Sequence, residues 1–449
     1  MAEAVPGRFA PGKRGPGKEE KGMDLMETIG KRESVVGVIG LGYVGLPLAM
    51  EAAEAGFWVI GLEKDGQKRK RLLRGEAIYE GLDGAKLRRL LEEGKLRVSG
   101  DSGELLSCGV ICICVPTPLS RTRDPDLGYV REAARLAGKA IREGERPKLV
   151  ILESTSYPGT TREVVLPTLE REGLSACADF HLAYSPERVD PGNSTWYIAN
   201  TPKLVGGMRE CCADQAEAFY GLFVERPVRV SSLEVAEMAK LLENIFRGVN
   251  IALVNELWML CERMGLDVWE VIEAASTKPF GFMPFWPGPG LGGHCIPVDP
   301  FYLAWKAREY DFQTEFIELA GKVNVNMPYF VAGLVGRELN RAGRTLRGSR
   351  VLILGVAYKP DVGDTRETPA AKLMELLRAE GAEVLYHDPH APDFYLGGEM
   401  LESVELSPDT LRGCHCVVIV TAHRDVDYGL VVRSGLPVVD TRNALRKLR

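Results

Sequence analysis

The sequence predicts a mixed α/β protein in which two doubly wound domains, each built on a parallel sheet, are joined by a central all-α domain with a long helix. Two observations predict this fold class. Apolar, strand-like runs alternate with helical segments before residue 231 and again after residue 345, a pattern typical of parallel sheets covered on both faces. Between them, residues 235–265 form one helical pattern without proline. The 449 residues are enough for two or three domains.

The first doubly wound domain is expected over residues 34–231. Its predicted elements are a strand at 34–40, a helix at 46–56, a strand at 57–63 and apolar β-rich runs at 109–118 and 148–156. Residues 1–33 precede this domain and are rich in Gly, Pro, Lys and Glu. We expect a disordered tail there, because such a segment buries too little apolar surface to offset the entropy of ordering.

The central helical domain is expected over residues 232–344 and a second doubly wound domain over residues 345–449. Three apolar runs of the C-terminal part mirror runs of the first domain, namely 349–359, 383–389 and 416–423. The first turn of this second domain lacks the G-x-G-x-x-G pattern of its counterpart. The chain is therefore expected to carry a weak internal repeat on either side of a helical centre.

The composition argues against a protein that binds nucleic acid, spans a membrane or is secreted. The 56 Lys and Arg against 62 Asp and Glu give a net charge of −6, which argues against a nucleic-acid partner. No run of about 20 uncharged apolar residues predicts a membrane span, and no apolar signal sequence is present. The ten cysteines include no C-x-x-C pair, so we expect reduced thiols in a cytoplasmic enzyme. Possible metal ligands gather in the C-terminal part, but their spacing fits no common zinc site and we expect no metal there; they are His387, His390, Cys414, His415, Cys416 and His423.

The first candidate site is a glycine-rich turn, Gly40-Leu-Gly42-Tyr43-Val44-Gly45, that follows a predicted strand and opens a helix. Such a turn lets a pyrophosphate approach the backbone at a helix N-terminus, as in Rossmann-like domains. Glu63 ends the next strand, 18 residues after the last glycine. An acid at that position accepts hydrogen bonds from a free ribose 2′-hydroxyl and favours NAD over NADP. A tight turn without a ligand is the alternative.

A second candidate is the side-chain-poor segment PGPGLGGHCIPVDP, which presents Cys295. The glycines let the backbone approach a ligand closely, and a thiol in such a loop is accessible for nucleophilic attack. Asp299 lies four residues later and could hold a water molecule. From these residues alone, a turn with a buried cysteine is as good an interpretation. His294 is expected to have a structural role, because adjacent side chains diverge.

A third candidate lies on the long helix, where Lys240, Asn244 and Arg247 share one face at spacings of four and three. Lys240 could carry a proton and Asn244 could stabilise an oxyanion. A solvated helix face is the commoner interpretation of such a stripe.

Polar residues at predicted strand ends complete the candidates. Thr155 and, in a later loop, Glu187 and Arg188 could position a water molecule where ligands of doubly wound sheets bind, although such residues also serve as ordinary helix caps. Lys359 and Arg366 follow the first strand of the C-terminal domain and offer positive charge to an anionic ligand.

Taken together, these motifs resemble the nucleotide-sugar 6-dehydrogenases of the UDP-glucose/GDP-mannose dehydrogenase family. The resemblance covers about residues 34–445, nearly the whole chain outside the tail. It is carried, in chain order, by GVIGLGYVGLP, CVPTPL, ESTSYPGTT, SPERVDPGN, the K-x-x-x-N helix ending in NIALVNEL, GPGLGGHCIPVDP and GVAYKPDVGDTRE. An ordered set of this kind is far more specific than any single motif.

The resemblance implies that C6 of a nucleotide sugar is oxidised from alcohol to acid with two NAD in succession, by a homodimer or higher homo-oligomer. Cys295 would form a thiohemiacetal and then a thioester. The other catalytic residues implied are Lys240, Asn244, Asp299, Thr155 and Glu187. Cofactor contacts are implied for Gly40, Gly42, Tyr43, Val44, Gly45, Glu63, Lys68, Thr117, Thr155 and Arg366. Substrate contacts are implied for Glu187, Arg188, Lys240, Asn244, Arg247, Gly292 and Lys359.

The segment STKPFGFMPFWPGPG before Cys295 resembles the branch that acts on UDP-N-acetylglucosamine. UDP-glucose, UDP-N-acetylmannosamine, UDP-N-acetylgalactosamine and GDP-mannose remain open as substrates. Glu63 stands where the family usually has aspartate, which leaves the NAD interpretation intact. Two other classes are weighed: a two-electron hydroxyacid-type dehydrogenase, which also uses a Lys-x-x-x-Asn helix but no nucleophilic cysteine, and a non-catalytic dinucleotide-binding module.

Overall fold

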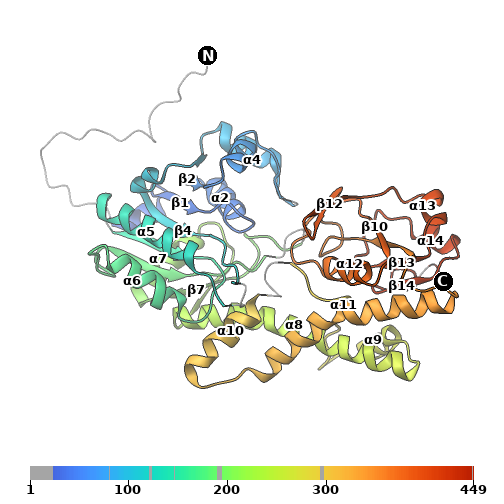
Figure 1. Cartoon of the computed structure of the whole chain (residues 1–449). Helices are drawn as coiled ribbons and strands as arrows, with labels where there is room; N and C mark the ends of the chain where they lie inside the picture. Colours follow the sequence, from blue (N-terminus) through green and yellow to red (C-terminus); the bar gives the residue numbers. More distant parts are fainter. Residues whose placement is uncertain are drawn as a thin grey trace, which may run out of the picture. The chain divides into compact units, whose positions relative to one another are not determined.

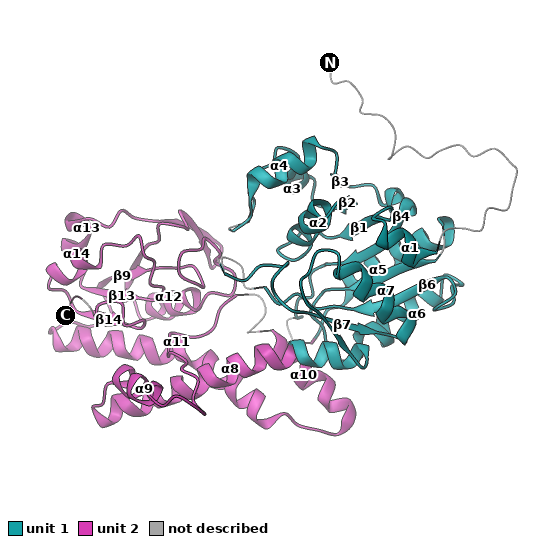
Figure 2. Ribbon diagram, turned by 180° about the vertical axis from the view of Figure 1, so that it is seen from behind, with its two compact units in different colours: residues 1–120, 125–240 teal, residues 121–124, 241–449 magenta. Residues whose placement is uncertain are grey.

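The computed structural model describes residues 24–79, 81–120, 124–145, 147–189, 195–293, 298–446 and 448. The chain divides into two compact units (Figure 2), unit 1 with residues 1–120 and 125–240 and unit 2 with residues 121–124 and 241–449. Unit 1 is an α/β layer structure around one large sheet, and unit 2 combines a smaller parallel sheet with long helices (Figure 1). The fold class predicted from the sequence is confirmed.

Unit 1 contains an eight-stranded sheet in the order β3-β2-β1-β4-β5-β6-β7-β8. Its strands are β1 Val35–Ile39, β2 Trp58–Leu62, β3 Leu96–Ser99, β4 Cys108–Ile113, β5 Lys148–Leu152, β6 Phe180–Tyr184, β7 Lys203–Gly207 and β8 Pro227–Val230. All neighbouring pairs are parallel except β6 and β7, which are antiparallel. Every residue of β5 is buried, as expected for a central strand covered on both faces.

Helices connect these strands and pack against the sheet (Figure 1). They are α2 Gly45–Glu54, α3 Gly66–Leu73, α4 Gly84–Glu92, α5 Gly128–Glu143, α6 Leu166–Glu170 and α7 Glu210–Tyr220. A further helix, α1 Leu25–Gly30, precedes β1 and packs on α7. The sequence analysis expects a tail through residue 33, whereas α1 forms there with Leu25 and Ile29 buried. Asp24 caps α1 by accepting a hydrogen bond from the Met26 N–H. The first 23 residues lie outside the described residues.

The long helix α8, Leu233–Met264, begins in unit 1 and continues into unit 2. Its 32 residues span about 48 Å, and its bounds agree with the helical pattern predicted at 235–265. The other helices before the C-terminal sheet are α9 Val268–Ser276, α10 Asp299–Ala307 and α11 Glu315–Arg341. None of the described helices combines the length and the apolar composition that crossing a bilayer requires.

The C-terminal sheet of unit 2 is parallel, in the order β10-β9-β13-β14. Its elements are β9 Arg350–Leu354, α12 Pro369–Ala379, β10 Glu383–His387, α13 Pro408–Arg412, β13 Cys416–Ile419, α14 Tyr428–Arg433 and β14 Val438–Asp440, with a hairpin of β11 Asp393–Leu396 and β12 Glu399–Glu402. On β9, Val351 and Ile353 belong to one apolar cluster and Leu352 and Leu354 to another. Both faces of this sheet are therefore covered, as in a doubly wound domain.

Candidate active site

The glycine-rich turn after β1 has the geometry of a phosphate-binding loop. Gly40 has φ +94°, and a Cβ there would lie 2.7 Å from the Cys114 carbonyl oxygen. A Cβ on Gly45 would lie 1.9 Å from the Gly40 carbonyl oxygen. A Cβ on Gly42 would have no atom of the described residues within 4 Å, so this side of the turn is open. Val44 precedes α2 without a capping side chain. The first-turn N–H groups of α2 and the open side of Gly42 therefore fit a pyrophosphate.

The side chains next to this turn form one connected group. Tyr43 packs against Tyr79, with ring centroids 4.0 Å apart and the rings tilted by 39°. Tyr79 donates a hydrogen bond to the Leu41 carbonyl. Lys68 Nζ lies 2.8 Å from Glu63 Oε2, at the end of β2. Burial lowers the pKa of Lys68, but hydrogen bonds to Glu63 and Tyr79 outweigh it and raise that pKa overall. An ammonium and a carboxylate are thus held together where an adenosine ribose binds in dinucleotide-binding domains.

Thr117 and Thr155 lie beyond the carboxyl ends of β4 and β5, which are adjacent parallel strands. Thr117 is buried and Thr155 is half-buried. The Ser154 hydroxyl donates a 2.7 Å hydrogen bond to the Val115 carbonyl and ties the two loops together. Because β1 pairs with β4 in parallel, both threonines lie at the same sheet edge as the glycine turn.

A buried charge network connects β5 to the loop after β6. Lys203 Nζ lies 2.7 Å from Glu153 Oε2 and 3.7 Å from Glu187 Oε2, and Tyr220 donates a hydrogen bond to Glu153. Burial opposes the charge on Lys203, but the two carboxylates raise its pKa overall, so it is an ammonium. The sequence analysis missed Lys203 and Tyr220, because nothing local marks a lysine in a strand as the partner of distant acids.

The Glu187 side chain is held in a fixed orientation. Its Oε1 accepts hydrogen bonds of 2.7 Å from the N–H groups of Arg188 and Val189. Arg188 donates to the Pro202 carbonyl at 2.7 Å. Glu187, Arg188 and Lys203 help to line a small cavity of about 10 Å³, enough for one water molecule.

The start of α8 is anchored by a buried carboxyl group that the sequence analysis did not select. Glu237 accepts hydrogen bonds from the Gly159 N–H and from the N–H and hydroxyl of Thr161. Burial raises the pKa of Glu237 to about 7, against the effect of these donors. Glu237 lies one turn before Lys240, so these bonds fix the loop that follows Thr155 to the helix that carries Lys240.

The three candidates on α8 differ in their surroundings. Lys240 is 9% exposed, and its Nζ forms no ion pair or hydrogen bond with another described residue. Asn244 donates a hydrogen bond of 2.5 Å to Asp299 Oδ2. Asp299 is the first residue of α10 and is buried. Arg247 is exposed. Asn244 and Asp299 are therefore in contact within unit 2.

The glycine segment before Cys295 is tied to α8 and α11 by buried amides. The Gly288 N–H donates to Asn255 Oδ1 at 2.9 Å, Asn255 donates to Asn324 Oδ1 at 2.9 Å, and Asn324 donates to the Gly248 carbonyl at 3.0 Å. Asn255 and Asn324 were not selected from the sequence, where they look like ordinary polar residues on helices. His294 and Cys295 lie outside the described residues.

The last glycines of this segment pack on the loop that follows β9. A Cβ on Gly292 would lie 2.7 Å from Tyr358 Cβ, and Gly293, with φ +83°, lies against the Tyr358 ring. The Gly293 N–H donates to the Arg366 carbonyl at 3.1 Å. Only glycine fits at these positions, because both are in contact with the neighbouring loop. The segment that leads to Cys295 and the loop with Lys359 are thus in direct contact.

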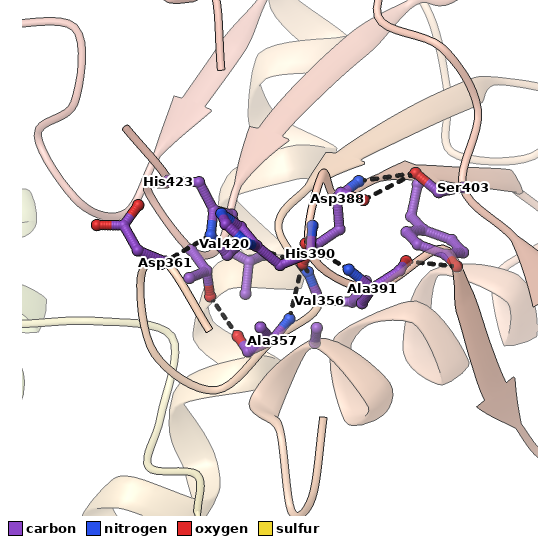
Figure 3. Close-up of polar contacts among 12 residues, drawn as sticks. Val356, Ala357, Asp361, Asp388, His390, Ala391, Ser403, Val420 and His423 are labelled. Carbon is purple, nitrogen blue, oxygen red and sulfur yellow. Dashed lines mark hydrogen bonds and ion pairs between the residues drawn. The ribbon is translucent and has the colours of Figure 1, made fainter. Parts of the chain in front are cut away.

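The loop after β9 is shaped by a buried Asp388–His423 pair (Figure 3). Asp388 Oδ2 accepts hydrogen bonds from the Val356 and Ala357 N–H groups at 2.7 and 2.9 Å and lies 3.1 Å from His423 Nε2. His423 Nδ1 accepts from the Asp361 N–H at 2.9 Å. Burial opposes ionisation of Asp388, but these donors lower its pKa to about 2. The pair fixes both ends of the turn that presents Lys359.

The guanidinium of Arg366, expected to reach a cofactor, pairs within unit 2 with Asp364. Its Nη2 lies 2.6 Å from Asp364 Oδ2, and its Nε also donates to that carboxylate. Lys359 is half-buried in the same loop. The structure therefore places Lys359 and Arg366 on one loop.

Three potential metal ligands also meet here, namely Asp361, His390 and His423. His423 uses both ring nitrogens within the protein, one toward Asp388 and one toward the Asp361 N–H. His390 Nε2 lies 3.5 Å from Asp425 Oδ2. Structural hydrogen bonds therefore account for His423 (Figure 3), whereas His390 Nε2 is buried without a hydrogen-bond partner among the described residues.

Changing Asp388 to asparagine is expected to lower the free energy of unfolding by about 3 kcal/mol, because it leaves the buried His423 without its carboxylate partner. In the folded protein the pKa of Asp388 is lowered to about 2. The ionised carboxylate therefore adds about 2 kcal/mol to the free energy of unfolding above pH ~4, and this contribution is lost as the pH falls toward 2. Denaturant unfolding measured from pH 7 to about pH 2 follows both effects. The exposed Asp393→Asn is the control. Equal stability of the two variants would contradict this role.

Comparison with known protein families gives a match along nearly the whole described chain. The UDP-glucose/GDP-mannose dehydrogenase family is matched by its NAD binding domain over residues 34–224, its central domain over residues 234–326 and its UDP binding domain over residues 352–447. The NAD binding match contains the glycine turn, and the UDP binding match contains Lys359.

Individual relatives agree with this match. The chain is 36% identical over 418 residues to a UDP-N-acetyl-D-mannosamine dehydrogenase of Pyrococcus horikoshii, covering 92% of this chain and 96% of the relative. It is 35% identical over 356 residues to a UDP-N-acetyl-D-glucosamine 6-dehydrogenase of Pseudomonas aeruginosa, covering 79% and 82%.

Among solved structures, a UDP-D-ManNAc dehydrogenase from Pyrococcus horikoshii superimposes with a TM-score of 0.83 at 35% identity, covering 91% of this chain and 96% of that one. Sequence, fold and glycine-turn geometry thus agree with the resemblance found in the sequence. The chain belongs to the UDP-glucose/GDP-mannose dehydrogenase family and is an NAD-dependent nucleotide-sugar dehydrogenase.

Proposed function

We propose that this enzyme oxidises the C6 hydroxyl of a UDP-N-acetylhexosamine to the uronic acid in four-electron chemistry through a Cys295 thioester. The observation that carries the proposal is the arrangement in unit 2, where the glycine segment leading to Cys295 packs on the Lys359 loop. In the same unit, Asn244 is hydrogen-bonded to Asp299. A two-electron hydroxyacid-type enzyme needs no such cysteine-bearing loop.

In this proposal residues 34–231 hold the cofactor and residues 345–449 hold the UDP moiety. The first-turn N–H groups of α2 and the open side of Gly42 would receive the NAD pyrophosphate, and Glu63 with Lys68 would bind the ribose. The other proposed cofactor contacts are Tyr43, Thr117, Thr155 and Arg366. NAD, when bound, accepts one hydride in each oxidation.

The proposed substrate contacts are Glu187, Arg188, Lys240, Asn244, Arg247, Gly292 and Lys359. Lys359 offers a cation to the diphosphate, on a turn that the Asp388–His423 pair holds in place. Gly292 packs against Tyr358 and is proposed to contact the substrate through its backbone.

The proposed reaction uses the chain's residues in four steps. The C6 alcohol loses a hydride and a proton to give an aldehyde, with Lys240 as proton carrier. The Cys295 thiolate adds to the aldehyde carbon, and Asn244 and Lys240 stabilise the oxyanion. Loss of a second hydride from this thiohemiacetal gives a thioester. Water, held by Thr155, Glu187 and Asp299, cleaves the thioester to the acid and returns the thiolate.

Covalent capture explains why one site performs both oxidations. A free aldehyde is reactive and could leave between the two steps, whereas a thiohemiacetal stays attached to the protein. The overall balance is one alcohol, one water and two NAD giving one carboxylate, two NADH and three protons.

Two N-acetylated sugars are supported. The aromatic segment before Cys295 favours UDP-N-acetylglucosamine, which is the sugar we propose. The Pyrococcus horikoshii relative, which is similar over almost the whole chain, is named for UDP-N-acetyl-D-mannosamine. Both sugars carry an acetamido group at C2.

We further propose a homodimer formed through the helical region, residues 232–344. In unit 2, α8 exposes large apolar side chains at helical spacing: Leu242 61%, Phe246 47%, Leu253 55%, Leu257 36% and Leu260 50%. A contiguous apolar stripe of this kind is typical of a surface that binds another protein.

A panel of nucleotide sugars tests the substrate. We expect kcat/KM for UDP-N-acetylglucosamine to exceed that for UDP-glucose and GDP-mannose by roughly 100-fold or more, because a pocket built for the acetamido group leaves polar groups unpaired with other sugars. UDP-N-acetylmannosamine and UDP-N-acetylgalactosamine are included. A preference for UDP-N-acetylmannosamine would change the proposed substrate but leave the proposed four-electron oxidation in place. Binding of NADH without turnover of any sugar would contradict an enzyme of this class.

A further inference from the structure

Four side chains with metal-ligating atoms gather in unit 1, away from the candidate active site. They are Cys177, His181, Cys211 and Cys212, and their ligand atoms all lie within 4.8 Å of one another. Cys177 Sγ lies 3.3 Å from Cys211 Sγ and 3.6 Å from Cys212 Sγ. We call these four residues the thiol–imidazole cluster.

The cluster joins two elements at the amino end of β6. Cys177 lies in the turn before this strand, with a left-handed φ of 65°, and its N–H donates to the Phe180 carbonyl at 2.7 Å. His181 is on β6, and Cys211 and Cys212 are in the first turn of α7. A left-handed φ is unusual for cysteine, so the surrounding contacts impose this conformation.

The cluster lies at the sheet edge opposite the glycine turn. β6 runs parallel to β5, which continues in parallel through β4 to β1. The glycine turn follows the carboxyl end of β1, whereas Cys177 precedes the amino end of β6. The cluster is therefore separate from the edge where the cofactor binds.

The sulfur separations fit a shared cation better than a disulfide. A disulfide needs the two sulfurs about 2.05 Å apart. In a tetrahedral zinc site with Zn–S bonds of about 2.3 Å, neighbouring ligand atoms lie about 3.7 Å apart. The distances of 3.3 and 3.6 Å are close to that tetrahedral edge. Three cysteines and one histidine are also a common set of ligands for structural zinc.

His181 provides an independent indication of a ligand. His181 is 8% exposed, and its Nδ1 is buried without a hydrogen-bond partner among the described residues. A buried ring nitrogen without a partner costs free energy that a bound ligand would recover.

We propose that the thiol–imidazole cluster binds one Zn²⁺, which clamps the turn before β6 to the first turn of α7. Three thiolates and an imidazole give a soft, closed coordination shell without a position for substrate, so the ion is structural. The sequence analysis expects no metal site, because it considers only short spacings. Here Cys177 and Cys211 are 34 residues apart and meet through the antiparallel pairing of β6 with β7.

The test is metal analysis of the full-length, untagged chain purified in reducing buffer. We expect about one zinc per chain, and close to none in Cys177→Ala and in His181→Ala. Cys414→Ala, which removes a buried thiol from unit 2, is the matched control and should keep its zinc. Removal of zinc with a chelator should lower the unfolding temperature of the wild type but not that of Cys177→Ala.

A second measurement distinguishes a missing metal site from a folding defect or from metal lost during purification. Addition of Co²⁺ to the chelator-treated wild type should give thiolate-to-cobalt charge-transfer absorption, with NADH binding retained. Absence of that absorption in a folded wild type that still binds NADH would overturn the proposal. Recovery of a Cys177–Cys211 disulfide and no metal would overturn it in favour of a redox role.

Discussion

Replacing Cys295 with serine is expected to lower the rate of carboxylic acid formation by roughly 10³-fold or more, because a serine hydroxyl is a much weaker nucleophile than a thiolate at neutral pH. NADH binding should be unchanged, since the glycine turn after β1 is in unit 1 and contains no part of the Cys295 loop. Acid formation measured by product analysis, together with NADH titration, checks both statements.

The control for this substitution is Cys414→Ser, which changes a buried thiol on the C-terminal side of unit 2. That variant should keep the wild-type kcat if it folds. Acid formation by Cys295→Ser at the rate of the wild type would remove the covalent step from the mechanism. Loss of NADH binding by Cys295→Ser would instead mean that the loop is a structural part of the cofactor site.

Replacing Lys240 with methionine is expected to lower kcat by roughly 10²–10⁴-fold, the range for loss of a general acid–base group. Methionine fills a similar volume, and Lys240 Nζ has no partner among the described residues that would be left unpaired. The variant should therefore fold. Steady-state kinetics with both substrates measure the effect, and the KM for NAD should be unchanged.

The split between kcat and KM decides the role of Lys240. A rise in the KM for the nucleotide sugar with unchanged kcat would assign Lys240 to substrate binding alone. Lys372→Met, on an exposed position of α12, is the control and should be indistinguishable from the wild type. A loss of activity in both variants would indicate a general effect of removing a lysine.

Features that depend on neighbours in the sequence could be predicted from the sequence. The glycine turn is an example, because its three glycines, the preceding strand and the following helix are all local. Asn244 and Asp299 are 55 residues apart and were assigned to one site through the family resemblance, but the hydrogen bond between them was not predicted.

Features built from distant residues could not be predicted in this way. Lys203 meets Glu153 across 50 residues, and Asn255 meets Asn324 across 69. Strands β7 and β8 were also missed, because β7 ends in two glycines and β8 begins with proline, both of which weaken a strand pattern. The tertiary fold brings these residues and strands together, and their contacts leave no periodic pattern in the sequence.

The measurement that tests the mechanism most directly is the number of NADH molecules released for each UDP-N-acetylglucosamine consumed, determined at completion with the acid product quantified. The Cys295 thioester mechanism predicts two NADH and one uronic acid per sugar. One NADH per sugar, with an aldehyde or ketone as the product, would contradict it and place the protein among two-electron dehydrogenases.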